Sequence, residues 1–141
     1  MLATPILGKG AEAALRREMD VNVFGVLAMA HAFAPVLAGN GGGALVNMLS
    51  VVSWYVYPFN ATYCVSKHAA LAVTNALRIE LKAQGTAVIG VYAGFIDTDM
   101  AAQVTGEKTS PPRLPSGRSM ASGVATNTFT PTRRRNVYGR N

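Results

Sequence analysis

Tyr63 and Lys67 are the residues whose types and spacing best suit catalysis. They are four apart in a segment of helical pattern, so their side chains would rise from the same face and could approach one ligand. A lysine ammonium beside a phenol favours the phenolate and lowers a pKa that is ordinarily about 10. The pair predicts a tyrosine that exchanges a proton with a substrate oxygen. Taken alone, the pattern Y-x-x-x-K is also common on ordinary helix surfaces.

Ser50 is a third candidate, because it ends a short apolar run that predicts a strand at residues 44–49. Open α/β sheets bind ligands at the carboxyl ends of their strands, so the hydroxyl would lie where it can hydrogen-bond a substrate carbonyl. Acyl transfer by Ser50 with Lys67 as the base is a weaker alternative, since the sequence has no nucleophile elbow.

With Asn22 added, the order and spacing of these residues resemble the catalytic tetrad of the classical short-chain dehydrogenase/reductase family. The resemblance covers roughly residues 15–103 and continues through the strings D-V-N-V-F-G, N-M-L-S, Y-C-V-S-K-H-A-A, N-A-L-R-I-E-L and G-F-I-D-T-D-M. Ala93 stands where the family usually has proline, a difference that removes no reactive group. The resemblance implies an NAD(P)-dependent oxidoreductase that transfers a hydride between the cofactor and a small carbonyl or alcohol substrate.

The resemblance also assigns catalytic roles to Asn22, Ser50, Tyr63 and Lys67. Tyr63 would be the proton donor or acceptor at the substrate oxygen, and Ser50 would orient the carbonyl. Lys67 would hold the nicotinamide ribose and lower the pKa of Tyr63. Asn22 would anchor a water in the proton relay.

The cofactor implied is NAD or NADP, and five residues would bind it: Tyr63, Lys67, Gly94, Ile96 and Thr98. Ile96 and Thr98 align with positions that contact the nicotinamide carboxamide in the family. Helices of family members pack against those of a second subunit, so a homodimer or homotetramer is expected.

The family's cofactor-binding turn, T-G-x-x-x-G-x-G, does not occur in the sequence, nor does an N-N-A-G segment or a residue that selects between NAD and NADP. Residues 8–10 have too few glycines, and no strand precedes them. We therefore expect an N-terminally truncated chain that lacks three βα units, about 100 residues. The main alternative to an active enzyme is an inactive remnant, or a subunit-association module, without the cofactor-binding half.

The elements that must position these residues follow from the pattern of apolar residues. A helix is predicted at 11–37, a strand covered on both faces at 44–49, a loop at 50–62, a helix at 63–84 and a strand at 86–92. This order contains a βαβ unit with parallel strands, so the fold class is α/β, a Rossmann-type doubly wound parallel sheet. The loop is rich in aromatic residues, which could wall a substrate pocket or simply pack there: Trp54, Tyr55, Tyr57 and Phe59.

The composition bears on three further features: disulfides, metal sites and membrane spans. Cys64 is the only cysteine, which excludes an intrachain disulfide and a cysteine metal cluster and favours a reducing, cytoplasmic location. No metal site is expected, because His31 and His68 have no partner at ligand spacing. The apolar stretch 21–38 contains Asn22, His31 and Pro35, so a buried helix is expected rather than a membrane span.

The net charge of +6 comes from residues 106–141, because the first 105 residues carry equal numbers of acidic and basic side chains. We expect residues 1–105 to form the partial catalytic region and residues 106–141 to be a basic, disordered tail. The run Arg133–Arg135 suggests an anionic partner such as nucleic acid. Such binding is a minor alternative, because residues 1–105 carry no excess of basic side chains. A frameshift is a further interpretation, since shifted codons can encode strings that resemble the family's C-terminal elements.

Overall fold

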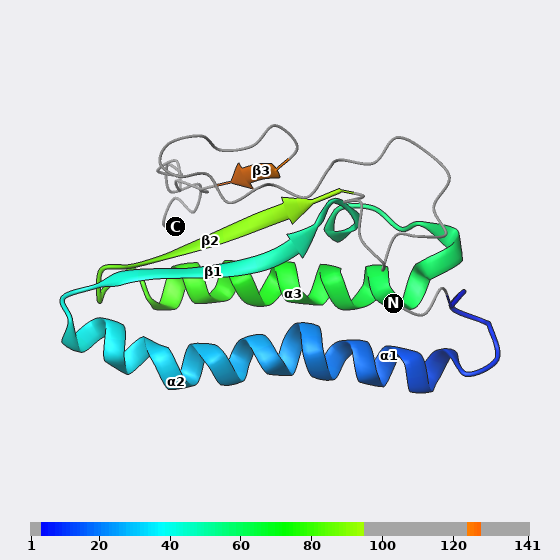
Figure 1. The fold of residues 1–141 in the computed structure, drawn as a ribbon, viewed down its shortest axis with the longest axis horizontal. Helices are drawn as coiled ribbons and strands as arrows, with labels where there is room; N and C mark the ends of the chain where they lie inside the picture. Colours follow the sequence, from blue (N-terminus) through cyan, green and yellow to red (C-terminus); the bar gives the residue numbers. More distant parts are fainter. Residues whose placement is uncertain (1–3, 95–123, 128–141) are drawn as a thin grey trace, which may run out of the picture.

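The computed structural model describes residues 4–94 and 124–127. Three helices lie on one side of a three-stranded sheet (Figure 1). The elements are α1 Ala11–Met19, α2 Gly25–Gly39, β1 Gly43–Ser50, α3 Ala61–Glu80, β2 Thr86–Ala93 and β3 Val124–Asn127. A π-helical turn at Asp20–Phe24 joins α1 to α2, and two 3₁₀ turns, Val51–Ser53 and Pro58–Asn60, lie between β1 and α3.

The predicted helix at 11–37 is confirmed, with the π turn as an unexpected feature. The helix ends at Gly39. Beyond it, Gly42 N donates a hydrogen bond to Leu37 O at 2.8 Å, which satisfies a backbone carbonyl at the helix end. By length and composition the continuous helix Ala11–Gly39 could cross a membrane, with a mean hydropathy of 1.8. Only 11% of its most apolar window is buried, so the expectation of a buried helix is wrong for the described residues, although the helix contacts α3 and β1.

The βαβ unit is also confirmed. β1 and β2 pair in parallel from Gly43↔Thr86 to Ser50↔Ala93, with α3 as the crossover between them. The helix runs from Ala61 to Glu80 rather than over 63–84, because residues 81–85 turn the chain back into β2. Gly85 closes this turn in the left-handed region, with φ of 75°.

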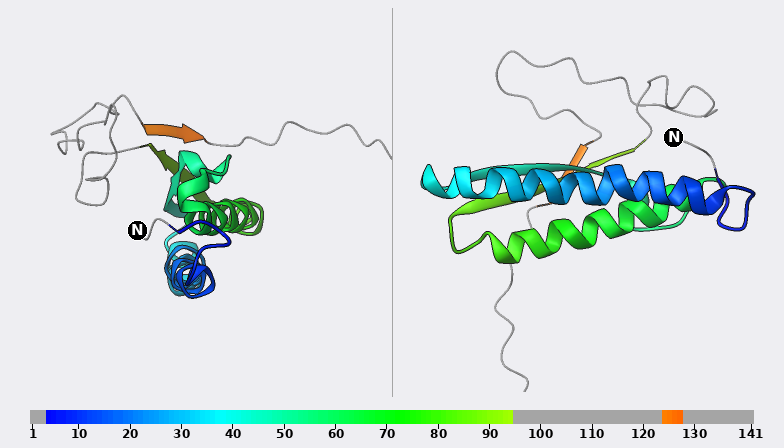
Figure 2. Two further views of the ribbon diagram at one scale, coloured as in Figure 1. Left: turned by 90° about the vertical axis from the view of Figure 1, so that its right-hand side faces the viewer. Right: turned by 90° about the horizontal axis from the view of Figure 1, so that it is seen from below.

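The core lies between the helices and one face of the sheet. Two clusters of buried residues fill it: Val23, Leu49, Ala70, Leu71 and Tyr92 in one, and Ala30, Leu77, Leu81 and Val88 in the other. The opposite face of β1 is open, and Val46 and Met48 are 57% and 58% exposed. The expectation that β1 is covered on both faces is therefore wrong for the described residues, because all three helices pack on the same side (Figure 2).

β3 lies within the segment that we expected to be disordered. It pairs antiparallel to β2, from Gly90↔Asn127 to Ala93↔Val124, so these four residues have regular structure. The arginine run and the rest of the basic tail lie outside the described residues, so the frameshift and anionic-partner interpretations stay predictions.

Candidate active site

Ser50 lies at the carboxyl end of β1, as predicted, directly beside the last residue of β2. Its hydroxyl donates to Ala93 O at 3.3 Å and accepts a hydrogen bond from Val52 N at 3.4 Å. Its backbone N–H donates to Ser53 Oγ at 3.2 Å, which caps the 3₁₀ turn that follows. The register of the parallel strands and this cap together fix the Ser50 side chain at the edge of the sheet.

Tyr63 lies in the first turn of α3, where its half-buried phenol faces Ser50. Burial raises the pKa of the Tyr63 phenol, and the Ser50 side chain opposes this rise only in part. The Lys67 ammonium is 5.6 Å from the centre of the Tyr63 ring, yet the pKa is raised rather than lowered as we expected. Desolvation is the largest influence on this pKa, so the phenol holds its proton at neutral pH.

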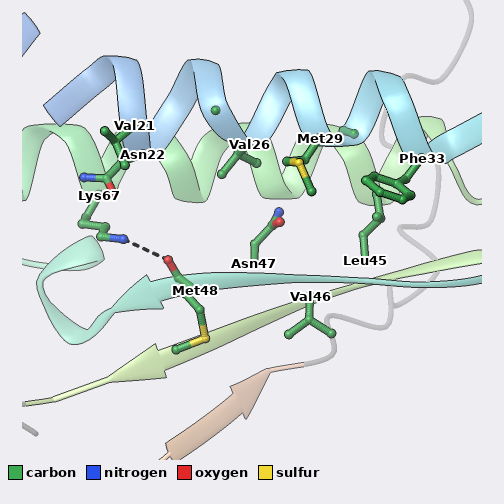
Figure 3. Close-up of a pocket in the computed structure, with 12 residues that line it drawn as sticks. Val21, Asn22, Val26, Met29, Phe33, Leu45, Val46, Asn47, Met48 and Lys67 are labelled. Atoms are coloured by element: carbon green, nitrogen blue, oxygen red, sulfur yellow. Dashed lines mark hydrogen bonds between the residues drawn. The ribbon is translucent and has the colours of Figure 1, made fainter. Parts of the chain in front are cut away.

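Lys67 extends from α3 to the neighbouring strand. Its Nζ atom donates to Met48 O at 2.9 Å (Figure 3). The side chain is buried, and this burial lowers the pKa of its ammonium. The bond holds the charge below the end of β1, within reach of the Tyr63 ring.

Asn22 lies in the middle of the π turn and connects to the same cluster through a residue that the sequence analysis missed. Asn22 Nδ2 donates to Ser66 Oγ at 2.9 Å, and Ser66 Oγ donates to Tyr63 O at 2.8 Å. A serine three residues after Tyr63 on a helix can bond back to its carbonyl, which is the one local signal that the sequence carried. The structure therefore brings all four predicted catalytic residues together at one end of the sheet.

Comparison with known proteins identifies the family. Residues 5–109 match the short chain dehydrogenase family. This chain belongs to that family.

Its relatives include reductases and dehydrogenases of several organisms. The chain is 41% identical over 91 residues to an NADPH-dependent 1-acyldihydroxyacetone phosphate reductase of Schizosaccharomyces pombe, and 36% identical over 93 residues to dehydrogenase/reductase SDR family member 7B of Xenopus tropicalis. These matches cover 64% and 65% of the chain but only 30% of each relative. The chain thus spans about a third of the length of these curated proteins.

Solved structures show the same fold. A short chain dehydrogenase of Burkholderia cenocepacia in complex with NADP is 41% identical, with a TM-score of 0.72 over 77% of this chain and 45% of that one. An acetoin dehydrogenase of Enterobacter cloacae is 29% identical, with a TM-score of 0.65 over 71% of this chain and 41% of that one. The Rossmann-type α/β fold predicted from the sequence is confirmed.

A cavity of about 380 Å³ adjoins this cluster of candidate residues. Asn22 and Lys67 line it, and α2 and β1 provide its mostly apolar walls (Figure 3). Ser50 and Tyr63 do not line it. The four aromatic residues of the loop do not line it either and are exposed, with Trp54 packed against Tyr92 at a ring distance of 5.5 Å.

The predicted cofactor residues are described only in part. Gly94 follows β2 directly and is exposed at the same end of the sheet as Ser50, and no atom of the described residues lies within 4 Å of the position that a Cβ would take. Ile96 and Thr98 lie outside the described residues. Within residues 4–94 and 124–127, no group of three or more potential metal ligands occurs.

Proposed function

We propose that this chain carries the catalytic residues of an NAD(P)-dependent oxidoreductase acting on a carbonyl or an alcohol. The observation that carries the proposal is the cluster of Ser50, Tyr63, Lys67 and Asn22 at the carboxyl end of β1. Tyr63 interacts with the Ser50 side chain, lies near the Lys67 ammonium and is connected to Asn22 through Ser66. The names of the relatives support the reaction class, since one is an NADPH-dependent reductase and one solved structure holds NADP.

Tyr63 and Ser50 would handle the substrate oxygen. The raised pKa of Tyr63 keeps the phenol protonated, which is the form that donates a proton to a carbonyl oxygen during reduction. Ser50 Oγ is fixed beside it and can hydrogen-bond the same oxygen. In the reverse direction, Tyr63 as phenolate would accept the proton of the alcohol.

Lys67 fits the ribose end of a nicotinamide cofactor. Its ammonium has three protons, and the bond to Met48 O uses one, so two remain for ribose hydroxyls. The exposed Gly94 has no side chain to block the same edge of the sheet. When bound, the nicotinamide supplies or takes up the hydride. The sequence contains no glycine-rich turn for the pyrophosphate, so the fit extends to the nicotinamide ribose alone.

A fluorescence titration of the chain with NADH and with NADPH tests the proposal. We expect binding that Lys67→Ala weakens, together with reduction of some member of a panel of ketones and aldehydes that Tyr63→Phe abolishes. Folded chain that binds neither nucleotide would overturn the proposal for this chain and favour an inactive remnant.

Association with a second copy is the other candidate property, and exposed apolar side chains favour it. Four large apolar residues of the helix Ala11–Gly39 are each about half exposed or more: Phe24, Met29, Phe33 and Val36. Several exposed large apolar side chains on one continuous helix favour an interaction surface. We propose a homodimer or homotetramer, and light scattering after size exclusion at micromolar concentration should give a multiple of the chain mass of 14.8 kDa. A monomer would contradict this.

A further inference from the structure

Ser66 connects two candidate catalytic residues, although it does not itself line the cavity beside them. The side chain is completely buried, with 0% of its surface exposed. It accepts a hydrogen bond from Asn22 Nδ2 at 2.9 Å and donates one to Tyr63 O at 2.8 Å. One hydroxyl therefore connects the side chain of one candidate catalytic residue with the backbone of another.

The direction of these two bonds determines how the Asn22 amide is oriented. A serine hydroxyl has a single proton, and Ser66 uses it at Tyr63 O, so Ser66 can only accept from Asn22. The NH₂ group of Asn22 must then face Ser66, and the amide oxygen must point away from it. Among the described residues, no group donates a hydrogen bond to this oxygen, and Asn22 lines the cavity that Lys67 also lines.

The backbone around Asn22 does not by itself select one orientation of the amide. The π turn at Asp20–Phe24 widens the helix by one residue and changes the face on which the following side chains lie. The terminal torsion of an asparagine is broad and roughly two-fold, so the rotamer alone does not separate the two amide orientations. The Ser66 bond crosses 44 residues of sequence and ties this turn to α3.

We propose that Ser66 is a positioning residue of this site, which orients the Asn22 amide so that its oxygen is an acceptor on the Lys67 side. The inference rests on the proposed function only for its catalytic consequence, because the family resemblance gives Asn22 a place in the proton relay. The orientation itself is a structural claim that can be tested without turnover.

The structural test is hydrogen exchange at the Asn22 side-chain NH₂, followed by NMR. In Ser66→Ala these protons should exchange about tenfold faster than in the unaltered chain, because one partly buried hydrogen bond is lost. Ser66→Thr keeps the hydroxyl and should restore slow exchange. If threonine does not fit this fully buried position, Ser66→Cys, which is close to serine in size and a weaker partner, should give an intermediate rate. Equal exchange in the unaltered chain and in Ser66→Ala would overturn the inference.

The catalytic test is a double-variant comparison. Ser66→Ala should lower kcat for carbonyl reduction about tenfold with little change in KM, and should have no further effect in an Asn22→Ala background. Thr86→Val is the matched control, because Thr86 is also a buried hydroxyl that accepts from a side-chain amide, Gln84 Nε2 at 2.8 Å, at the far end of β2. This control should lose stability without losing kcat.

The two tests separate the two proposals. Slow, Ser66-dependent exchange in a chain without cofactor binding or turnover supports the positioning role and overturns the proposed function. Turnover with additive effects of Ser66→Ala and Asn22→Ala overturns the positioning role and leaves the proposed function standing.

Discussion

The ammonium of Lys67 donates a 2.9 Å hydrogen bond to the main-chain oxygen of Met48, so a charge carried by α3 lies under the end of β1. The lysine is therefore held in place before any ligand arrives. Burial also lowers the pKa of this ammonium, because the charged form is less favourable there than in water.

Replacing Lys67 by alanine is expected to weaken nicotinamide binding about tenfold or more, since a hydrogen bond from a charged group is stronger than a neutral one. The dissociation constants for NADH and NADPH, measured by fluorescence, check this. Lys82→Ala is the control, because Lys82 is exposed just beyond α3. Equal loss in both variants would mean that general charge, and not the position of Lys67, attracts the nucleotide.

Removing the Tyr63 hydroxyl is expected to lower turnover about 10²–10⁴-fold, the usual contribution of a positioned general acid. The measurement is the initial rate of ketone reduction by Tyr63→Phe, with circular dichroism to show that the variant folds. Tyr55→Phe makes the same chemical change on an exposed ring and should keep full activity. Undiminished turnover in Tyr63→Phe would exclude the proposed acid.

The proximity of Tyr63, Lys67 and Ser50 could be predicted from the sequence, because the position of each residue follows from a local pattern. A spacing of four places two side chains on one helix face, and the end of an apolar run marks the end of a strand. The hydrogen bond from Asn22 to Ser66 could not be predicted in this way, because its two residues are 44 apart in the sequence. It also depends on a π turn, which no residue pattern in the sequence predicts.

Two other features depended on packing that a sequence does not show. The pKa of Tyr63 was predicted from the nearby ammonium alone, whereas the burial of the phenol, which is set by the tertiary fold, is the largest influence and raises it. The apolar run in β1 predicted cover on both faces, but Val46 and Met48 lie on a face that no described helix covers. An apolar run indicates that a strand can be buried and does not say what buries it.

Glu18 on α1 should make stability depend on pH. Both of its carboxylate oxygens are buried without a hydrogen-bond partner in the described part of the chain, and burial raises the pKa of this carboxyl. The neighbouring Thr62 hydroxyl opposes the rise in part, but it donates to Thr4 O at 3.5 Å. Because the folded-state pKa is above the unfolded value of about 4.3, the folded chain binds the proton more tightly, and protonation favours folding.

The stability that the protonated Glu18 contributes is thus fully present below the unfolded pKa and is lost as the pH rises through the folded pKa. Glu18→Gln should raise Tm by a few degrees at about pH 8, and the difference should shrink toward about pH 4. Glu12→Gln is the control on the same helix, since Glu12 is exposed and paired with Arg16 at 2.8 Å. A Glu18→Gln difference in Tm that is constant with pH would show that this carboxyl is not the titrating group.

The close approach of two turns predicts a large effect of a single methyl group. Gly42 has a φ of 120°, and a Cβ there would lie 2.6 Å from Gly85 O, in the turn between α3 and β2. Gly42→Ala should therefore lower the free energy of unfolding by at least about 1–3 kcal/mol, through backbone strain and the separation of the two turns. Gly39 lies three residues earlier, in α2, and no atom of the described residues is within 4 Å of the position that its Cβ would take. Gly39→Ala should therefore leave the free energy of unfolding unchanged or raise it by up to about 1 kcal/mol. Urea denaturation of both variants measures the difference, and equal midpoints would mean that the turns are not in contact in solution.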